Sequence, residues 1–467
     1  MKQRFNTLEE NEDIYQQAIY DCFIHKWTRN DILSYIEKNA GIPRHELFIA
    51  EFENTLKEVK EEVAESCAMS VEQLIEDIMN GEDVDVFPPK VRKKRDGMNG
   101  KMRDIALLEI EHQLIEHVTF LLLLPHLEAS LLPTQHASIP GRGQTALKKQ
   151  VQRFIRRSLG VKYFQKTDMK GAYASVQYSV VIRMLKKDIP SATEIFTLLE
   201  FLSKLAPGGH LIIGGYLDAW LFNYVMSKVI KRAYTCGETR HGRFKRHAVA
   251  IVSFMDDCLI LTRSKKGIKA VIKIMTEYSL KDLGMQLKIT TGLIRLCNVG
   301  EEKRRRSEKS KARRGCPAID MGGYRIYRDH IAIRPRVFKR IRRQSLRAWK
   351  EYKKTGTLQI QSARSMISYF GFLKQSDSVK VCKKYHVYKL IKISKKVSSF
   401  YAKVKRQERL GVIDDLRRST EQYKAELSAG GGTSRWPADG RYYKEHLGSV
   451  ARRSGDVSVR RGAVLCA

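Results

Sequence analysis

Two adjacent acidic residues interrupt a long apolar segment, and no other feature restricts the possible folds of the chain as strongly. Asp256 and Asp257 lie within Ile251–Leu261, whose other residues are mainly Val, Ile, Leu, Phe and Met. Burying two like charges side by side is costly unless a cation neutralises them. The segment predicts two strands joined by a turn that carries both carboxylates, where a hard divalent cation can bind. An ordinary Asp-Asp hairpin turn is the alternative.

A second strand-like segment also ends in an acid. Within Tyr163–Tyr173, Asp168 follows an apolar run typical of a strand, and Tyr173 follows five residues later. If a neighbouring strand brings this carboxylate to Asp256 and Asp257, the three acids form a site for two metal ions that supports phosphoryl chemistry. An unrelated strand with an N-capping Asp is the alternative. The three acids are the candidate catalytic and metal-binding residues.

The charge of the chain favours a polyanionic partner. Its 86 Lys and Arg exceed its 51 Asp and Glu, which gives a formal net charge of +35, and such an excess repels itself in the folded state. Residues 1–87 contain 8 basic and 20 acidic side chains, a net of −12, so the remainder carries +47. Helical periodicity within residues 1–87 predicts an acidic helical module; a solvating extension with no specific partner is the alternative.

The rest of the chain shows three further patterns. From about residue 97 to 300, helical and strand-like segments alternate, and Met102–Leu124 is predicted to be one long helix that stops at Pro125. From residue 332 the chain is predicted to be helical and strongly basic. Residues 427–467 include three consecutive glycines and are predicted to be disordered. The apolar stretches are too short for a membrane span, and eight isolated cysteines fit a reducing cytosol.

The two acidic segments, in this order, resemble the palm motifs of reverse transcriptases. Phe254–Asp257 is similar to the aromatic-x-Asp-Asp motif, and Asp168 with Tyr173 is similar to the first palm motif. Other resembling segments, in chain order, are the basic fingers segment Lys101–Ile105, the loop Ser138–Gly143, the loop and helix Ile213–Asn223, the primer-grip segment Met321–Arg334 and the thumb helix Ser365–Leu373. The chain departs from the family at Ile212 and Ile213, where Pro is usual, and at Asp218, where a polar Ser is frequent.

The resemblance implies an α+β fold of the right-hand polymerase type, with fingers, a palm built on an antiparallel sheet, and a helical thumb. It places fingers and palm at 88–330 and primer grip and basic thumb at 331–426. Charge and composition, and not the resemblance, give the acidic helical N-terminal module at residues 1–87 and the disordered tail at 427–467. The resemblance further implies a divergent member of the bacterial or phage type, in the superfamily that includes retron and group II intron enzymes, acting in the cytoplasm of a bacterial host.

The activity implied is RNA-directed DNA polymerisation, in which deoxynucleotides are added to a primer 3′-hydroxyl by a two-metal mechanism. The implied cofactor is a pair of Mg²⁺ ions, with Mn²⁺ as a substitute. Implied partners are the RNA template, the primer, the product DNA and deoxynucleoside triphosphates, with a dedicated noncoding RNA as a further candidate and no membrane. The alternatives are an antiphage-defence, mobile-element or template-independent polymerase on the same fold, and a non-catalytic basic RNA-binding scaffold.

The resemblance also assigns residues to two binding sites. The nucleotide-binding candidates are Lys101, Arg103, Tyr173, Gly214, Gly215 and Lys288, with Tyr173 at the position of a steric gate that favours deoxynucleotides. The nucleic-acid-binding candidates are Arg142, Tyr324, Arg325, Lys339 and Arg343. Solvated cations and core tyrosines are the alternatives for these residues.

Overall fold

The computed structural model describes residues 5–405, except residues 12, 25, 28, 45, 48–55, 96–101, 158–159, 299 and 302–316. The chain divides into two compact units, Met1–Lys405 and Arg406–Ala467, and the first contains every described residue. Lys101 and the predicted disordered tail at 427–467 therefore lie outside the described residues. Within the described part, no helix combines the length and the apolar character that crossing a membrane requires.

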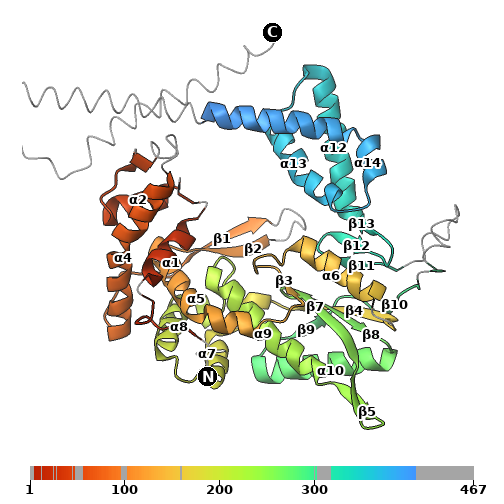
Figure 1. Cartoon of the computed structure of the whole chain (residues 1–467), viewed down its shortest axis with the longest axis horizontal. Helices are drawn as coiled ribbons and strands as arrows, with labels where there is room; N and C mark the ends of the chain where they lie inside the picture. Colours follow the sequence, from red (N-terminus) through yellow and green to blue (C-terminus); the bar gives the residue numbers. More distant parts are fainter. Residues whose placement is uncertain are drawn as a thin grey trace, which may run out of the picture. The chain divides into compact units, whose positions relative to one another are not determined.

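A six-stranded sheet forms the centre of the fold (Figure 1). Its strands follow the order β10-β4-β8-β7-β3, and β9 pairs with β4. All pairings are antiparallel except the one between β3 and β7. The strands are β3 (Gln135–His136), β4 (Tyr163–Met169), β7 (Ala248–Phe254), β8 (Asp257–Thr262), β9 (Leu287–Ile289) and β10 (Ile294–Arg295).

The continuous apolar run of β7 and β8 reflects burial on both faces of the sheet. Ile251 and Ile260 belong to one hydrophobic cluster, whereas Val252 and Leu259 belong to another. Because successive side chains of a strand point to opposite faces, a strand covered on both sides has no polar face. The helices around this sheet are α6 (Gln144–Arg157), α7 (Tyr178–Asp188), α8 (Thr193–Leu205), α9 (Tyr216–Tyr234) and α10 (Lys265–Leu283).

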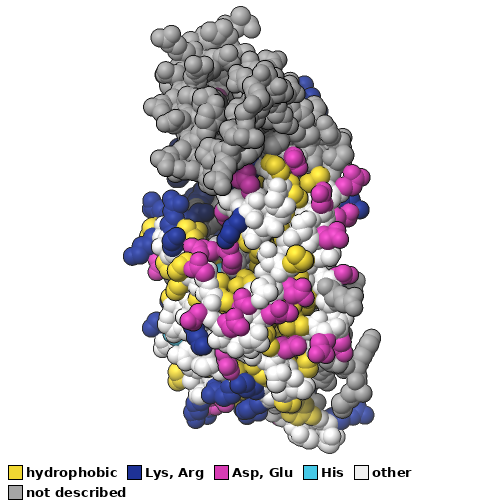
Figure 2. All heavy atoms as spheres, turned by 90° about the vertical axis from the view of Figure 1, so that its left-hand side faces the viewer, with side chains coloured by type: hydrophobic (Ala, Val, Ile, Leu, Met, Phe, Trp, Pro, Cys, Tyr) yellow, Lys and Arg dark blue, Asp and Glu magenta, His cyan; other side chains and the backbone are white. Residues whose placement is uncertain are grey.

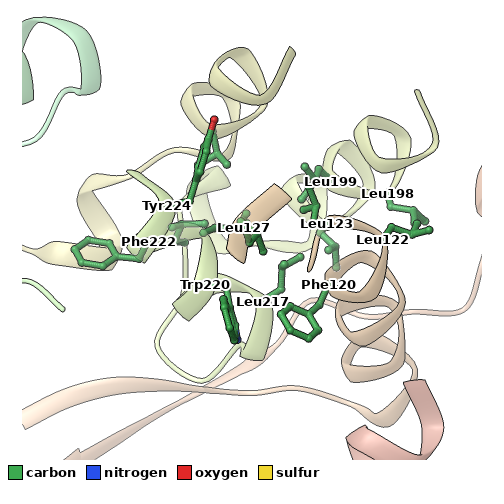
Figure 3. Packing of buried hydrophobic residues seen from close by; sticks show 14 of the residues in the cluster. Phe120, Leu122, Leu123, Leu127, Leu198, Leu199, Leu217, Trp220, Phe222 and Tyr224 are labelled. Atoms are coloured by element: carbon green, nitrogen blue, oxygen red, sulfur yellow. The ribbon is translucent and has the colours of Figure 1, made fainter. Parts of the chain in front are cut away.

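The N-terminal helices share one core with the helices of the central region. They are α1 (Ile14–Phe23), α2 (Asn30–Asn39) and α4 (Leu56–Asn80), and their buried side chains join those of α5 (Ile110–Ser130), α8 and α9 in a single cluster. Figure 3 shows this core where α5, α8 and α9 meet. The labelled side chains are Phe120, Leu122, Leu123, Leu127, Leu198, Leu199, Leu217, Trp220, Phe222 and Tyr224. The core therefore runs across the predicted boundary at residue 88.

The outer face of the N-terminal helices is acidic. Figure 2 views the side on which these helices lie, and Asp and Glu side chains are frequent on it. On α4 the buried side chains include Val63, Cys67, Val71 and Ile75, at helical spacing. The exposed acids of the same helix are Glu58, Glu61, Glu62, Glu65, Glu72 and Glu76. Helix α4 thus carries its acids on the exposed face and its apolar side chains on the buried face.

The predicted single helix from Met102 to Leu124 is wrong in its first part. Met102–Leu107 forms strand β2, which pairs with β1 (Lys90–Arg95) in an antiparallel ribbon, and the helix α5 begins only at Ile110. Apolar residues spaced three or four apart in this segment suggested a helix, but Ala106 is its only buried side chain. Long-range backbone pairing with β1 overrides the local preference.

Helix α5 also continues past Pro125, where the prediction ended it. A proline has no N–H and leaves the carbonyl four residues earlier without its helical partner. That carbonyl is Leu121 O, and the side-chain amide of Asn6 donates to it at 2.9 Å. The backbone N–H of Asn6 donates to the adjacent Leu122 O, also at 2.9 Å. The segment before α1 therefore replaces the hydrogen bond that Pro125 removes.

A small sheet and several basic helices follow the six-stranded sheet along the chain. The sheet contains β11 (Ile319–Met321), β12 (Tyr324–Ile326) and β13 (Ile331–Ile333). The helices are α12 (Pro335–Thr355), α13 (Ile360–Lys374), α14 (Val379–Lys384) and a further helix at 387–405. Helix α12 buries Val337, Ile341, Ser345 and Ala348, so its basic side chains lie on the opposite face. The remaining short elements are η1 (Ala172–Ser175), η2 (Pro207–Gly209), β5 (Gly237–Arg240) and β6 (Arg243–Arg246).

Candidate active site

The turn between β7 and β8 is tight and strained. Phe254 pairs with Asp257, so the turn consists of Met255 and Asp256. Met255 has a φ of +55°, in a region that favours glycine. Its N–H donates to His136 O at 3.2 Å, and its sulfur lies 3.5 Å from the buried side-chain amide of Asn223. Contacts from β3 and α9 therefore hold the tip in place, as a strained functional turn requires.

The sheet register brings Asp168 beside this tip. Strand β4 pairs with β8 up to Thr167 opposite Cys258, so Asp168 is one residue beyond the last pair and faces Asp257. The carboxyls of Asp168 and Asp256 are within hydrogen-bonding reach of each other. Burial, and then the negative charge of Asp168, raises the pKa of Asp256 to about 6. Two of the three predicted carboxylates thus share one small space.

The third carboxylate has a different partner. Lys166 Nζ lies 2.7 Å from Asp257 Oδ2, and the lysine side chain is 9% exposed. Burial raises the pKa of Asp257, and the Lys166 ammonium opposes that effect. Sequence reasoning missed Lys166, although one signal was available: it stands two residues before Asp168, and alternate residues of a strand share a face.

The donor set fits a divalent cation in part. Asp168 and Asp256 offer hard carboxylate oxygens, which such ions prefer, and their mutual repulsion is what a cation would relieve. Among the described residues, no group of three or more His, Cys, Asp and Glu is arranged to hold a metal ion. Asp168 and Asp256 are therefore the residues that could hold one, while Asp257 is bound to Lys166.

Tyr173 lies against this site. It belongs to the short helix η1, which begins directly after Gly171, and Gly171 has a left-handed backbone conformation. Its ring stacks on Phe222 with centroids 5.2 Å apart. Burial raises its pKa, the charges of Asp218 and Asp256 raise it further, and Arg103 opposes them. These electrostatic neighbours place the predicted nucleotide-binding residues Tyr173 and Arg103 in the same environment as Asp256.

Gly214 allows the backbone to approach strand β2 closely. It has a φ of +134°, and a Cβ there would lie 2.5 Å from Ala106 O. The same two segments are joined by a hydrogen bond from Ala106 N–H to Ile213 O at 2.8 Å. A side chain at residue 214 would therefore push the ribbon of β1 and β2 away from the loop before α9.

Gly215 makes room for a buried pair of acids. A Cβ there would overlap Asp218 Oδ2 and lie 2.5 Å from Glu116 Oε1. Asp218 Oδ1 accepts a hydrogen bond from Tyr178 OH at 2.8 Å, and Glu116 Oε2 accepts one from Tyr216 N–H at 2.7 Å. Both carboxyls are fully buried. Sequence reasoning noticed Asp218 only as a departure from the family and missed Glu116.

Burial determines the charge of this pair. It raises the pKa of Asp218 to about 7, and burial together with Asp218 raises the pKa of Glu116 well above its ordinary range. Glu116 Oε1 and Asp218 Oδ2 have no hydrogen-bond partner among the heavy atoms. His112 is 3.9 Å from Glu116, but burial lowers its pKa to about 4, so it is neutral and adds no compensating charge.

Lys288 pairs with Asp168 across strands β9 and β4, and its side chain is exposed beside the carboxylates.

The predicted nucleic-acid-binding residues lie in varied surroundings. Lys339 and Arg343 are exposed on α12. Arg142 is half-buried, and its guanidinium donates to Leu132 O at 2.9 Å.

Two further candidates of this group lie on β12. Tyr324 is 3% exposed, and the Lys148 ammonium lies over its ring at 4.4 Å. The neighbouring Arg325 is 3.5 Å from Asp320. The Lys148 contact joins the small sheet to α6, the Arg325–Asp320 pair lies within the sheet, and the Tyr324 ring has little open surface.

The mixed arrangement of helices and sheets is consistent with the right-hand polymerase fold, and the predicted α+β fold class is confirmed. Residues 91–290 match the family described as reverse transcriptase (RNA-dependent DNA polymerase). This region of the chain is therefore similar to a reverse transcriptase domain, and the match supports the predicted enzyme class, a reverse transcriptase nucleotidyltransferase. Enzymes of this family generally use divalent metals. The matched region contains the predicted carboxylates and all the predicted nucleotide-binding residues.

Several solved polymerase structures are similar to the chain. A truncated apo telomerase from Candida tropicalis is 11% identical, with 54% of this chain and 56% of that chain covered and a TM-score of 0.36. The Candida albicans telomerase in complex with a fragment of telomeric RNA is 12% identical, with 68% and 64% covered and a TM-score of 0.37. A Sicinivirus RNA-dependent RNA polymerase is 13% identical, with 47% and 48% covered and a TM-score of 0.30. The chain thus spans less than two thirds of the length of these three chains. The comparison with curated proteins found no significant match.

Proposed function

We propose that this chain is an RNA-directed DNA polymerase that adds deoxynucleotides to a primer 3′-hydroxyl under the direction of an RNA template. The observation that carries the proposal is the meeting of Asp168 and Asp256, from two paired strands, inside the region that matches the reverse transcriptase family. Adjacent carboxylates at a strained and well-anchored turn are costly for folding, so their presence favours a catalytic role.

In this proposal, Asp168 and Asp256 hold the divalent cations, and Asp257 with Lys166 positions the tip. Two Mg²⁺ ions, or Mn²⁺ in their place, would activate the primer hydroxyl and stabilise the leaving pyrophosphate. Lys166 keeps the Asp257 side chain at a fixed place below the turn. The protein therefore supplies position and charge, which dominate catalysis in phosphoryl transfer.

Nucleotide selection is assigned to the residues around Tyr173. Its ring, held flat against Phe222, would clash with a ribose 2′-hydroxyl and so favour deoxynucleotides. Arg103 lies close enough to affect the Tyr173 hydroxyl, and we assign it and Lys101 to the triphosphate, because guanidinium and ammonium groups suit phosphate oxygens. Lys288, exposed beside Asp168, is the candidate donor of a proton to pyrophosphate.

The basic face of α12 is proposed to follow the duplex. Lys339 and Arg343 are exposed there, and their contacts with phosphates would be sensitive to salt. The finer aspects of the proposal are a bacterial or phage-type enzyme, a cytoplasmic location, and a dedicated noncoding RNA as a further partner.

Primer extension on an RNA template tests the proposed function. The assay supplies each type of nucleotide separately, with and without Mg²⁺, and we expect incorporation of deoxynucleotides only with the metal. Asp256→Asn is the catalytic variant, and Asp282→Asn, an exposed position on α10, is the matched control. Incorporation that survives Asp256→Asn, or that requires no template, would contradict the proposal.

A further inference from the structure

A pocket of about 630 Å³ lies between the N-terminal helices and the loop before α9. We call it the α1–α9 pocket; its walls include Asp21, Ile24, Lys26, His117, Tyr216 and Trp220. The volume is within the range of small-molecule and cofactor sites. The first three residues precede residue 91, where the match to the reverse transcriptase family begins, so the pocket is partly built by a segment outside that family region.

The pocket offers a flat aromatic surface. Tyr216 is 41% exposed, and one face of its ring stacks on His117 with centroids 4.4 Å apart and an interplanar angle of 11°. Phe120 meets the same ring edge-on at 5.0 Å. The two contacts fix the Tyr216 ring, and its other face is available to the pocket. On the side of the N-terminal helices, Ile24 is 46% exposed and also lines the pocket.

The polar groups of the pocket favour an uncharged ligand. His117 is almost completely buried, and its Nδ1 has no hydrogen-bond partner. The acid Asp21 lines the pocket as well, and its negative charge would repel a phosphate that entered it. The ammonium of Lys26 donates to Gln113 Oε1 at 3.0 Å, so this cation is held at the wall. A planar ring with hydrogen-bonding edges fits such a site, and a phosphate does not.

From these observations we infer that the α1–α9 pocket binds an unpaired nucleobase of the RNA template, which stacks on Tyr216 against Ile24. The inference rests on the proposed function, because a polymerase that copies RNA brings an unpaired template base next to the incoming nucleotide, for which Gly214 and Gly215 at the pocket wall are binding candidates. Aromatic platforms bind bases of any sequence, since every base has a π-face. The site is incomplete without the segment around Ile24, which gives the N-terminal helices a part in holding the template.

Three primer–template duplexes test this inference with the full chain. The RNA template of the first ends at the templating base, that of the second continues for three unpaired nucleotides, and that of the third continues with abasic sugars. Dissociation constants are measured by fluorescence anisotropy without nucleotides, so that catalysis does not enter. We expect the overhang with bases to bind more tightly than the abasic overhang by about fivefold or more, the usual effect of one stacked base.

The variants identify the pocket as the source of that preference. Tyr216→Ala and, independently, Ile24→Ala are expected to reduce it, and Tyr216→Phe is expected to keep it because the phenylalanine ring still stacks. Leu280→Ala, which truncates an aliphatic side chain on α10 that is 57% exposed, is the matched control and keeps the preference as well.

The outcomes separate the inference from the proposed function. If the duplexes bind and the bases of the overhang add nothing, or if both alanine variants keep the full preference, the pocket assignment is overturned and the polymerase proposal stands. If no primer–template duplex binds the wild-type chain, both are overturned. A preference that falls in both alanine variants and persists in Tyr216→Phe supports the assignment.

Discussion

Replacing Lys166 by methionine removes the cation that neutralises Asp257. The two side chains form an ion pair of 2.7 Å, with 9% and 32% of their surfaces exposed, and Asp257 Oδ1 is buried without a partner. The methionine would fill most of the space of the lysine stem, so the main loss is electrostatic. Breaking a buried pair by removing one partner costs about 3–5 kcal/mol, because a charge remains buried and uncompensated.

The expected consequence is a lower melting temperature. An unfolding entropy of about 2.1 cal/mol/K per residue, taken over the compact unit Met1–Lys405, gives a Tm shift of roughly 1.2 °C per kcal/mol, so Lys166→Met is expected to lower Tm by about 4–6 °C. Thermal unfolding of the full chain, followed by circular dichroism, measures this shift. Lys288→Met is the matched control, because Lys288 pairs with Asp168 on the adjacent strand but is exposed; its cost is expected to stay below about 0.5 kcal/mol.

A double variant decides whether the ion pair is the cause. Lys166→Met combined with Asp257→Asn leaves no buried charge, and we expect it to recover most of the lost stability. The reasoning is refuted if Lys166→Met destabilises no more than Lys288→Met. It is also refuted if the double variant is as unstable as the sum of the single variants, because the two residues would then not interact.

Asp256→Asn is expected to abolish nucleotide incorporation while changing RNA affinity only a few-fold; filter binding beside primer extension checks this, and lost binding would contradict a catalytic role. Tyr173→Ala is expected to admit ribonucleotides, and unchanged discrimination in competition assays would reject the gate. Burial raises the pKa of Asp218 to about 7. Between about pH 4 and 7, the folded chain therefore keeps a proton on this carboxyl, whereas the unfolded chain has lost it. Stability therefore falls as pH rises through this window, by up to roughly 4 kcal/mol. Asp218→Asn is expected to reduce this slope in denaturation curves, and the rest is expected from Glu116, whose pKa burial also raises; an unchanged slope would assign it to other groups.

The strand ends and their acids could be predicted from the sequence because the signals are local. The apolar runs on either side of Asp256, and the run before Asp168, gave the strands β7, β8 and β4 within a few residues. A turn of two residues between two strands needs no knowledge of the rest of the chain. The order of motifs along the chain suggested that Asp168 meets Asp256. In the structure, the register of β4 on β8 brings them together.

The partners of the buried charges could not be predicted, because they depend on pairings between distant segments. Lys166 is one of many lysines in a strongly basic chain, and only its burial beside Asp257 distinguishes it. Glu116 and Asp218 are a hundred residues apart and meet only where α5 packs against the start of α9. Gly215 was expected to approach a base or a sugar, whereas the structure shows that it also makes room for this acid pair.

The N-terminal helices illustrate the same limit at the level of domains. Their composition separated them from the basic remainder of the chain, but composition says nothing about the contacts of a segment. The carbonyl that Pro125 frees in α5 is bound by Asn6, and the cores of α1 and α5 form one cluster. A helix whose hydrogen bonding is completed by a preceding segment is not independent of it. Helix α5 also supplies Glu116 to the acid pair beneath Gly215 and His117 to the α1–α9 pocket. The N-terminal helices therefore bear directly on the shape of the pocket and of the Gly214–Gly215 loop, a candidate for nucleotide binding.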